Sequence, residues 1–249
     1  MPSVAIQRLE SALQARKFDH TVAAPWAIGS SSAERERRVT TTGVATLDAA
    51  LGGGWERGEI SELVGPLSSG RVSVLVASLA AATSRGDVVA LVDALDRLDP
   101  AAVLSAGVDL DRLLWVRGPS MTSPVRGGDG WAEVLNRAVR AFDLIVRAGG
   151  FAMVVLDVAD IPSRWLRALP LSTWMRIGHV NEGRDTACVL MGESAMGRSA
   201  HGVSVRLSAV PRWTGCSTQS RRFAGFDVQA DIARAHVARG CGESVKFKI

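Results

Sequence analysis

The residues of this sequence with the clearest chemical potential form one glycine-rich stretch, GPLSSGRVS, at positions 65–73. Its glycines have the G-x-x-x-x-G spacing of a phosphate-binding loop, in which backbone amides and the N-terminus of the next helix hold phosphate groups. A working loop continues with Lys, which reaches the terminal phosphates, and with Ser or Thr, whose hydroxyl binds Mg²⁺. Here those positions are Arg71 and Val72. The stretch keeps the glycines of a nucleotide site and lacks two of its side chains.

The replacements change what such a loop can do. Arg71 keeps a positive charge, but its guanidinium is longer and planar, so it does not simply replace a lysine. Val72 has no oxygen, and Ser73 stands one residue later, about 100° further round a helix. Asp157, in the apolar run MVVLD, stands where the partner acid of a metal site is expected. The predicted remnant of a nucleotide site is Gly65, Pro66, Ser68, Ser69, Gly70, Arg71, Val72 and Asp157.

Alternating strands and helices are expected to position these residues. A strand at 59–65 precedes the loop and a helix at 73–84 follows it. The runs at 87–94 and 151–160 are almost continuously apolar, which is typical of strands covered on both faces of a sheet. The alternation predicts an α/β fold with a mainly parallel central sheet flanked by helices. The other expected strands are 112–118, 186–193, 203–210, 226–239 and 244–249, and the other expected helices are 100–106, 131–148 and 164–177.

The chain is predicted to have three regions. Apolar residues at helical spacing between Val4 and Phe18 indicate an amphipathic N-terminal helix, placed at 1–20. The run GSSSA and the charged cluster ERERR indicate a linker at 21–42. Residues 43–249 are expected to form the core domain.

The amino-acid composition is typical of a globular protein with a hydrophobic core. Hydrophobic residues make up 47% and charged residues 22% of the 249 positions, and no run is long and apolar enough to predict a membrane span. Three cysteines without CxxC spacing favour a reducing cytoplasm and no zinc site. The net charge of +4 is local, since Met196 to Ile249 holds nine basic and three acidic residues. This basic C-terminal segment faces DNA, an acidic protein partner, or solvent alone.

Together with its surroundings the loop resembles the bacterial recombinase RecA. The likeness covers roughly 43–249 and implies a RecA-like core. It also implies an N-terminal helix like the one that RecA docks onto a neighbouring protomer. The matching segments, in order, are TGVATLDAALGGG, GEISELVGPLSSG, VDA, LDP and GVDLDRLL.

The catalytic positions depart from the RecA pattern. The Lys-Thr pair of the RecA loop corresponds to Arg71 and Val72. The catalytic glutamate corresponds to Leu95, an aliphatic residue that cannot activate water. Asp96 follows, and we expect its carboxylate to point elsewhere. The comparison therefore implies a protein that is not an ATPase and has no required cofactor, with ATP and Mg²⁺ binding not expected.

The DNA-binding and subunit-contact positions depart as well. The segment between Asp157 and the strand at 186 is shorter than the first DNA-binding loop of RecA, and GESAMGRSAHG at 192–202 is shorter than the second. RecA also supplies two lysines to a neighbour's nucleotide, and the best counterparts here are Arg234 and His236. Loss at several separate sites suggests that the fold is kept for another purpose.

With a RecA-like sequence of this length that departs from the recombinase pattern, the chain is similar to members of the ImuA family, also labelled SulA-like. The resemblance implies a cytoplasmic accessory protein of mutagenic translesion synthesis in the SOS response to DNA damage. Its implied partners are ImuB, an inactive Y-family polymerase homologue, and RecA, at one end of a filament. An error-prone replicative-type polymerase is implied indirectly, and a membrane is not. An alternative is a divergent DNA-dependent ATPase or recombination mediator in which Arg71 replaces the lysine. A third hypothesis, a division inhibitor, rests on the family label alone.

Tryptophan and arginine are common anchors of protein interfaces, so some of them are candidates for partner binding. The segment RWTGCSTQSRRF at 212–223 is polar and basic without periodicity. It is either a disordered loop, which we favour, or a partner-binding segment. The candidate partner-binding residues are Ile6, Leu9, Leu13, Trp165, Trp174, Trp213, Arg221 and Arg222.

Overall fold

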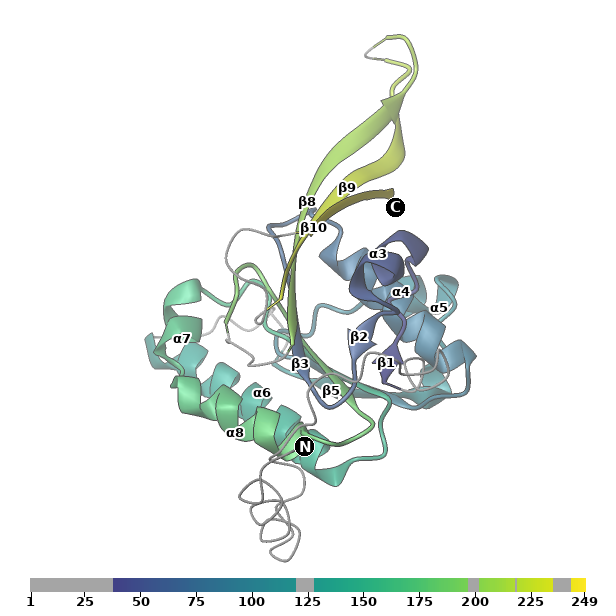
Figure 1. The fold of residues 1–249 in the computed structure, drawn as a ribbon. Helices are drawn as coiled ribbons and strands as arrows, with labels where there is room; N and C mark the ends of the chain where they lie inside the picture. The colour runs from purple at the N-terminus through teal and green to yellow at the C-terminus, as the bar shows by residue number, and fades with distance from the viewer. Residues whose placement is uncertain (1–37, 120–127, 197–201, 218, 235–242) are drawn as a thin grey trace, which may run out of the picture. The chain divides into compact units, whose positions relative to one another are not determined.

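A computed structural model gives the fold of the chain (Figure 1). It describes residues 38–119, 128–196, 202–217, 219–234 and 243–249. The helix expected at 1–20, with Ile6, Leu9 and Leu13, and most of the linker expected at 21–42 lie outside the described residues. The end of that expected linker is part of the folded unit, because strand β1 (Val39–Thr40) pairs with strand β2 (Trp55–Glu56).

A mainly parallel sheet forms the centre of this unit. Its strands are β3 (Ile60–Val64), β4 (Val89–Asp93), β5 (Leu113–Arg117), β6 (Met153–Asp157), β7 (Ala187–Gly192), β8 (Val203–Thr214), β9 (Arg222–Arg234) and β10 (Glu243–Lys248). They lie in the order β10-β9-β8-β3-β7-β6-β4-β5. All pairs from β8 to β5 are parallel, whereas β9 and β10 are added antiparallel at one edge. The α/β fold expected from the sequence is confirmed.

Helices cover both faces of the sheet, as Figure 1 shows. One layer holds α3 (Ala45–Leu51), α4 (Arg71–Ser84) and α5 (Pro100–Ser105). The other holds α6 (Gly128–Ala148), α7 (Ser163–Ala168) and α8 (Leu171–Asn181). Within the described residues no helix has the length and apolar character needed to cross a bilayer.

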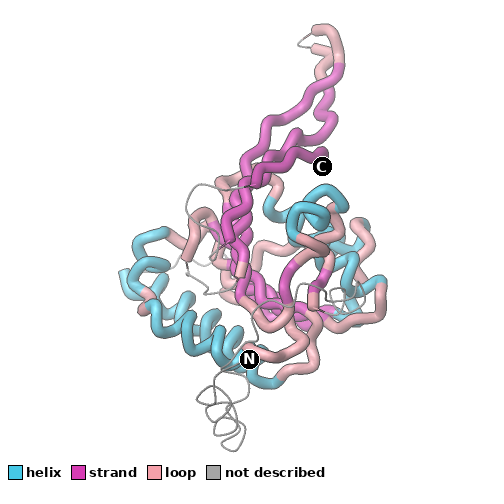
Figure 2. The backbone as a smooth tube through the Cα atoms, viewed as in Figure 1, coloured by secondary structure: helices cyan, strands magenta, loops and turns pink. Residues whose placement is uncertain are grey.

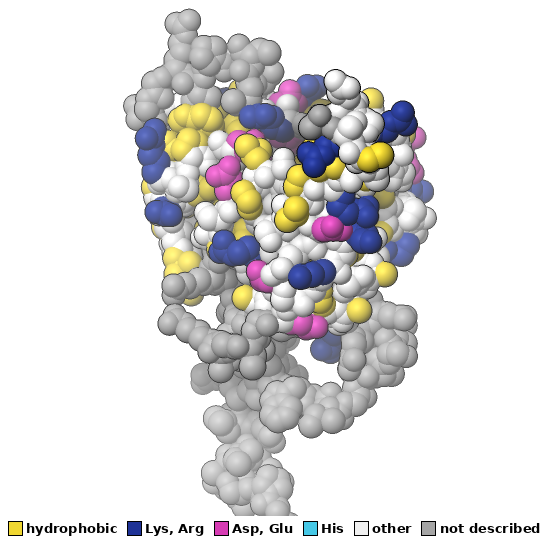
Figure 3. All heavy atoms as spheres, turned by 90° about the horizontal axis from the view of Figure 1, so that it is seen from above, with side chains coloured by type: hydrophobic (Ala, Val, Ile, Leu, Met, Phe, Trp, Pro, Cys, Tyr) yellow, Lys and Arg dark blue, Asp and Glu magenta, His cyan; other side chains and the backbone are white. Residues whose placement is uncertain are grey.

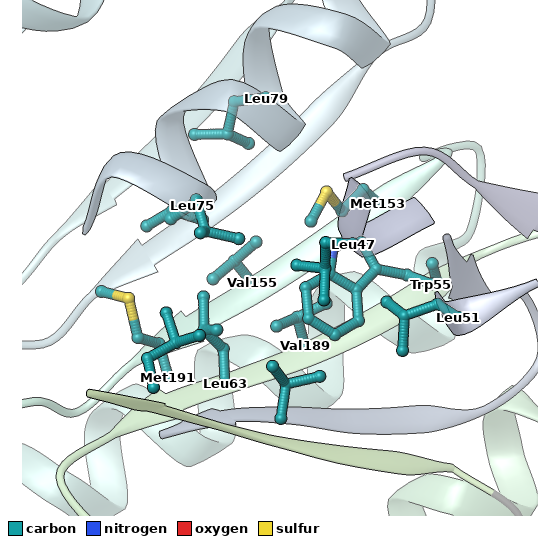
Figure 4. Close-up of a cluster of buried hydrophobic side chains, with 14 of the residues drawn as sticks. Leu47, Leu51, Trp55, Leu63, Leu75, Leu79, Met153, Val155, Val189 and Met191 are labelled. Carbon is teal, nitrogen blue, oxygen red and sulfur yellow. The ribbon is translucent and has the colours of Figure 1, made fainter. Parts of the chain in front are cut away.

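The central strands are apolar on both sides because each side packs on a helical layer. In β6, Met153 and Val155 join the cluster under α3 and α4, whereas Val154 and Leu156 join the cluster under α6 and α8. Figure 4 shows the first of these clusters, in which Leu75 and Leu79 of α4 lie over the sheet. Side chains of successive strand residues point to opposite faces, so a doubly covered strand must be apolar throughout.

The single helix expected at 164–177 is wrong, because the segment forms two helices. α7 ends at Ala168, and Leu169 has an extended backbone with ψ 128°. Pro170 is the cause, since a proline pushes the preceding residue out of the helical region and itself lacks an amide hydrogen. α8 then begins at Leu171.

The preference for a disordered loop at 212–223 is wrong for the two ends of that segment. Residues 212–214 belong to β8 and residues 222–223 to β9, which pair as an antiparallel ribbon with Trp213 opposite Phe223. Figure 2 shows this ribbon continuing past the helices of the unit. Backbone pairing orders these two ends without a buried face, so their sequence shows no simple alternation of apolar and polar residues.

Candidate functional site: a phosphate-loop backbone with altered side chains

The glycine-rich loop connects the end of β3 to the start of α4, as the sequence predicts. Gly70 is the N-cap residue of α4 and has φ +89°, a left-handed conformation that favours glycine. Within the loop the Ser69 amide donates to the Pro66 carbonyl oxygen at 3.2 Å. Ser68 also has positive φ, at 60°. The backbone is therefore the sharply turned strand–loop–helix connection from which phosphate-binding loops are built.

Gly65 is required by close packing at the start of the loop. A Cβ atom there would lie 2.5 Å from the Ser69 Oγ and 2.7 Å from the Leu207 carbonyl oxygen. Its amide donates to the Gly192 carbonyl oxygen at 3.1 Å. The Ser69 hydroxyl is buried and has no hydrogen-bond partner among the described residues.

Arg71 turns its charge inward. The residue is 4% exposed, and one guanidinium nitrogen donates to the Gly65 carbonyl oxygen. The other terminal nitrogen lies 3.2 Å from one carboxylate oxygen of Asp160. The second oxygen of Asp160 lies 3.5 Å from a guanidinium nitrogen of Arg97. Arg71 therefore bonds to the loop itself and to a carboxylate three residues beyond β6. A phosphate that recruits it must compete with this partly buried ion pair, and breaking the pair is costly because the guanidinium of Arg71 is itself buried.

The position that follows Arg71 offers no ligand to a metal ion. Val72 is 53% exposed and ends in methyl groups. Leu67, within the loop, is 70% exposed. The solvent-facing side chains of this loop therefore include two aliphatic ones, and one of them, Val72, stands where a magnesium site needs an oxygen atom.

Two carboxylates lie side by side at the ends of neighbouring strands. Asp93 of β4 is paired in register with Asp157 of β6. Asp157 accepts a hydrogen bond from the Ala159 amide at 2.9 Å. Burial raises the pKa of Asp157 to about 7, and the negative charges of Asp93 and Asp160 add to this rise. Asp157 thus lies where the sequence places it, in surroundings that disfavour its charged form.

Asp93 has a structural role, because its carboxylate accepts hydrogen bonds from the Leu98 amide at 2.9 Å and from the Trp115 indole at 3.4 Å. Leu95 is 1% exposed and packs in the cluster under α6. Asp96 points away to Arg117, which donates to both its oxygens at 2.7 and 2.8 Å. These bonds lower the pKa of Asp96 from its usual value.

The side chains at this site do not fit Mg²⁺-dependent cleavage of a nucleotide. Arg71, Val72 and Leu95 stand at the positions that the resemblance to RecA assigns to the loop lysine, the metal-binding hydroxyl and the general base. Among the described residues no three His, Cys, Asp or Glu side chains come together as a metal site. What remains is a phosphate-loop backbone whose positive charge is neutralised internally.

The candidate partner-binding residues that the structure describes do not form one surface. Trp174 is 4% exposed in the cluster under α6, which corrects its assignment as a surface anchor. Trp165 is partly buried against the same cluster. Trp213 is 53% exposed on the β8–β9 ribbon, and Arg221 and Arg222 are exposed beside it.

The sequence did not predict two residues that contact the candidate side chains. Asp160 is the carboxylate that holds Arg71, and the only sequence signal was an acid just past a buried strand. Phe223 packs edge to face on Trp213, with ring centroids 5.8 Å apart. Its signal was an aromatic residue within a basic segment.

Comparison with known proteins supports the fold over most of the chain. The family model of the RecA N-terminal domain matches residues 7–163. Protein RecA of Synechococcus elongatus is 37% identical over 117 residues, and that of Methylococcus capsulatus is 38% identical over 131. These matches cover 47% and 52% of the chain but only 29% and 34% of the relatives, so the chain spans about a third of their length.

A solved structure extends the likeness toward the C-terminus. The RadB recombinase superimposes on 85% of this chain and 96% of its own, with a TM-score of 0.55. At 18% identity this similarity concerns the fold alone. The family match over residues 7–163 covers more than half of the sequence. The chain belongs to the RecA N-terminal domain family.

Proposed function

We propose that this chain is a non-catalytic, RecA-fold accessory protein of bacterial mutagenic translesion synthesis, similar to ImuA, that acts by binding other proteins. The observation that carries the proposal is the position of Arg71. Its guanidinium is buried and bonded to Gly65 and Asp160. The charge that would hold a terminal phosphate is already neutralised inside the protein.

Two further features support a non-enzymatic role. Leu95 fills the general-base position with a buried aliphatic side chain that cannot accept a proton. Val72 removes the oxygen that would hold Mg²⁺. Each change alone would reduce ATP hydrolysis, and together they leave neither an ion to neutralise the phosphates nor a base to activate water.

The loop carries apolar surface that suits a protein partner better than a nucleotide. Leu67 and Val72 are exposed on either side of Gly70 in the sequence, and Ile249 lies beside Gly70, because its Cδ1 is 3.3 Å from where a Cβ of Gly70 would be. We name Leu67, Val72 and Ile249 the loop patch. An inactive Y-family polymerase of the ImuB type is the proposed occupant, and that identity rests on the resemblance to ImuA. RecA, at a filament end, is the proposed second partner, and an error-prone polymerase is recruited indirectly.

Capture of purified partners tests this function. The immobilised full chain is expected to retain an ImuB-type protein and RecA filaments without added ATP. Leu67→Glu with Val72→Glu should reduce capture of the ImuB-type protein at least tenfold. The matched control is Leu144→Glu with Met175→Glu, since these side chains are also exposed, at 59% and 65%, but lie on α6 and α8. Equal loss with both pairs, or no capture by the natural chain, would contradict the proposal.

The RecA interaction has its own test in the N-terminal segment. Deleting residues 1–20 should abolish retention of RecA filaments and leave capture of the ImuB-type protein intact. Unchanged filament retention would count against docking through this segment.

A second function has one observation in its favour. The strand–loop–helix backbone is retained, with a cation at Arg71 and an acid at Asp157. A divergent ATPase of this kind would bind a fluorescent ATP analogue at micromolar concentration with Mg²⁺, and both Arg71→Ala and Asp157→Ala would abolish that binding. The accessory role predicts that Mg²⁺ does not tighten binding of the analogue.

A further inference from the structure

Strand β10 forms one edge of the sheet, and among the described residues no strand pairs with its outer side. Its pairing with β9 fixes which backbone groups face outward. Phe226 and Ile249 exchange both of their backbone hydrogen bonds, at 2.8 and 3.1 Å. In an antiparallel pair such bonded positions alternate with positions whose groups point the other way. The N–H and C=O groups of Ser244, Lys246 and Lys248 therefore point away from β9.

The two faces of this edge differ in chemistry. Phe247 is 8% exposed and belongs to the core cluster under α3 and α4, and Val245 packs against the same cluster. Lys246 and Lys248 alternate with them, so their side chains leave the opposite face, where both residues are exposed. A strand laid beside β10 would meet apolar side chains on one face and ammonium groups on the other.

The outer face also has room for the side chains of such a strand. A hollow of about 460 Å³ lies over β8, β9 and β10, and both lysines line it together with Asp227 and Gln229. Asp227 is opposite Lys248 in the register, but its carboxylate pairs with Arg212 at 3.5 Å. Lys246 and Lys248 form no ion pair with another described residue.

The charge of the edge decides which strand fits it. A second copy of the chain, paired antiparallel about Phe247, would set lysine opposite lysine, which is repulsive. The residues outside the described ranges have no acidic excess, since 1–37 holds five basic and four acidic residues and the shorter ranges hold no acid. Figure 3 looks onto the end of the unit from which the ribbon projects, and Lys and Arg side chains are spread over it. The edge favours an acidic strand from another protein.

We propose that β10 is extended by an antiparallel strand of another protein in which acidic and apolar residues alternate. Acidic residues lie opposite Lys246 and Lys248 and pair with their ammonium groups. The apolar residue between them packs beside Phe247, on the face that α3 covers. Backbone hydrogen bonds to the edge supply affinity, and the alternating side chains supply selectivity. This edge goes beyond the proposed function, whose contacts lie at the loop patch and in the N-terminal segment.

Fluorescence anisotropy on the full chain tests the side-chain requirement with a labelled peptide, Gly-Ser-Glu-Val-Glu-Val-Glu-Gly-Ser. Lys246→Glu with Lys248→Glu should weaken binding about tenfold or more, because two attractive pairs become repulsive. Arg140→Glu with Arg167→Glu makes the same change of charge at exposed helical positions and should leave binding unchanged. A peptide with lysine in place of each glutamate should not bind.

Methylation of the peptide amides tests the backbone pairing. In an antiparallel strand the amides of the glutamates point toward β10, because these residues lie opposite Ser244, Lys246 and Lys248. The amides of the valines point away. N-methylation at the glutamates should therefore abolish binding, whereas N-methylation at the valines should have little effect. A charge-only interaction would not distinguish the two peptides.

Amide hydrogen exchange locates the pairing on the chain. The amides of Lys246 and Lys248 should exchange rapidly in the free protein and slowly with the peptide, while that of Phe247 is slow in both. Slow exchange of Lys246 and Lys248 in the free protein would mean that another segment of this chain covers the edge, and the proposal would be wrong.

Three further outcomes would overturn the proposal: no binding of the acidic peptide, equal losses in the lysine and control variants, or methylation at the valines that costs as much as methylation at the glutamates. The peptide experiments contain no ImuB-type protein and no RecA. Capture through the loop patch can therefore succeed or fail independently of them.

Discussion

The phosphate loop and the ribbon tip, which is the outer end of the β8–β9 ribbon at residues 211–217 and 219–226, both hold arginine, in opposite surroundings. Arg71 is 4% exposed and bonded to Gly65 and Asp160, whereas Arg221 and Arg222 are exposed and unpaired among the described residues. A buried guanidinium with a fixed partner stabilises its own fold, while an exposed one is available to a ligand. The difference teaches that burial and pairing, not residue type, decide which cations can act on another molecule.

Breaking the ion pair at the loop should give the largest effect. Asp160→Ala leaves the buried charge of Arg71 without its carboxylate, and we expect a loss of about 3 kcal/mol in the free energy of unfolding. Urea denaturation measures it. Arg71→Met combined with Asp160→Ala should lose less than Asp160→Ala alone, because no unpaired charge remains.

The control for that experiment is an exposed pair. Glu133 and Arg137 are neighbours on the surface of α6, with side chains 63% and 75% exposed. Glu133→Ala should change stability by about 0.5 kcal/mol or less. Similar losses at Asp160 and Glu133 would remove the contrast between buried and exposed arginines.

The pH dependence of stability tests the acid beside the loop. The pKa of Asp157 rises from 3.8 to about 7, so the folded protein keeps a proton that the unfolded chain releases. Its contribution is complete below about pH 4 and is lost as the pH rises through 7. Asp157→Asn should therefore match the natural protein near pH 4 and exceed its stability by a few kcal/mol at pH 8, since each unit of pKa difference is worth about 1.4 kcal/mol.

Burial also raises the pKa of Glu59 to about 7, but this does not affect the comparison between Asp157→Asn and the natural protein. It is present in both proteins, so its contribution cancels in the difference between them. If the difference in the free energy of unfolding between Asp157→Asn and the natural protein is the same at pH 4 and pH 8, the raised pKa of Asp157 is contradicted.

The smallest effect on stability is expected at the ribbon tip. Trp213→Ala removes a half-exposed ring that lies beyond the core, and the free energy of unfolding should change by about 0.5 kcal/mol or less. Differential scanning calorimetry measures the change. A loss of several kcal/mol would mean that Trp213 supports the fold.

The sequence predicted most elements of the core and the loop because those rest on local patterns. Glycine spacing located residues 65–70, and unbroken apolar runs located β4 and β6. The partner of Arg71 could not be predicted, since Asp160 is 89 positions away and meets it only through the order of the strands. Trp174 and Trp213 show the same limit, because equal residue types end up 4% and 53% exposed.

The ribbon tip was misjudged for a different reason. Beyond Phe226 its strands pair with each other without covering the core, so residues 212–223 lack the alternation by which half-buried strands are recognised. Gly215 and Gly225, both with φ above +100°, allow the turn and the irregular pairing that a disordered loop would not need.

Phosphate release from the pure protein with ATP and Mg²⁺ tests the central claim most directly. We expect none above the blank, with or without single-stranded DNA, because Arg71 is held by Asp160 and neither Val72 nor Leu95 offers an oxygen. Sustained, Mg²⁺-dependent release that Arg71→Ala abolishes would contradict the account.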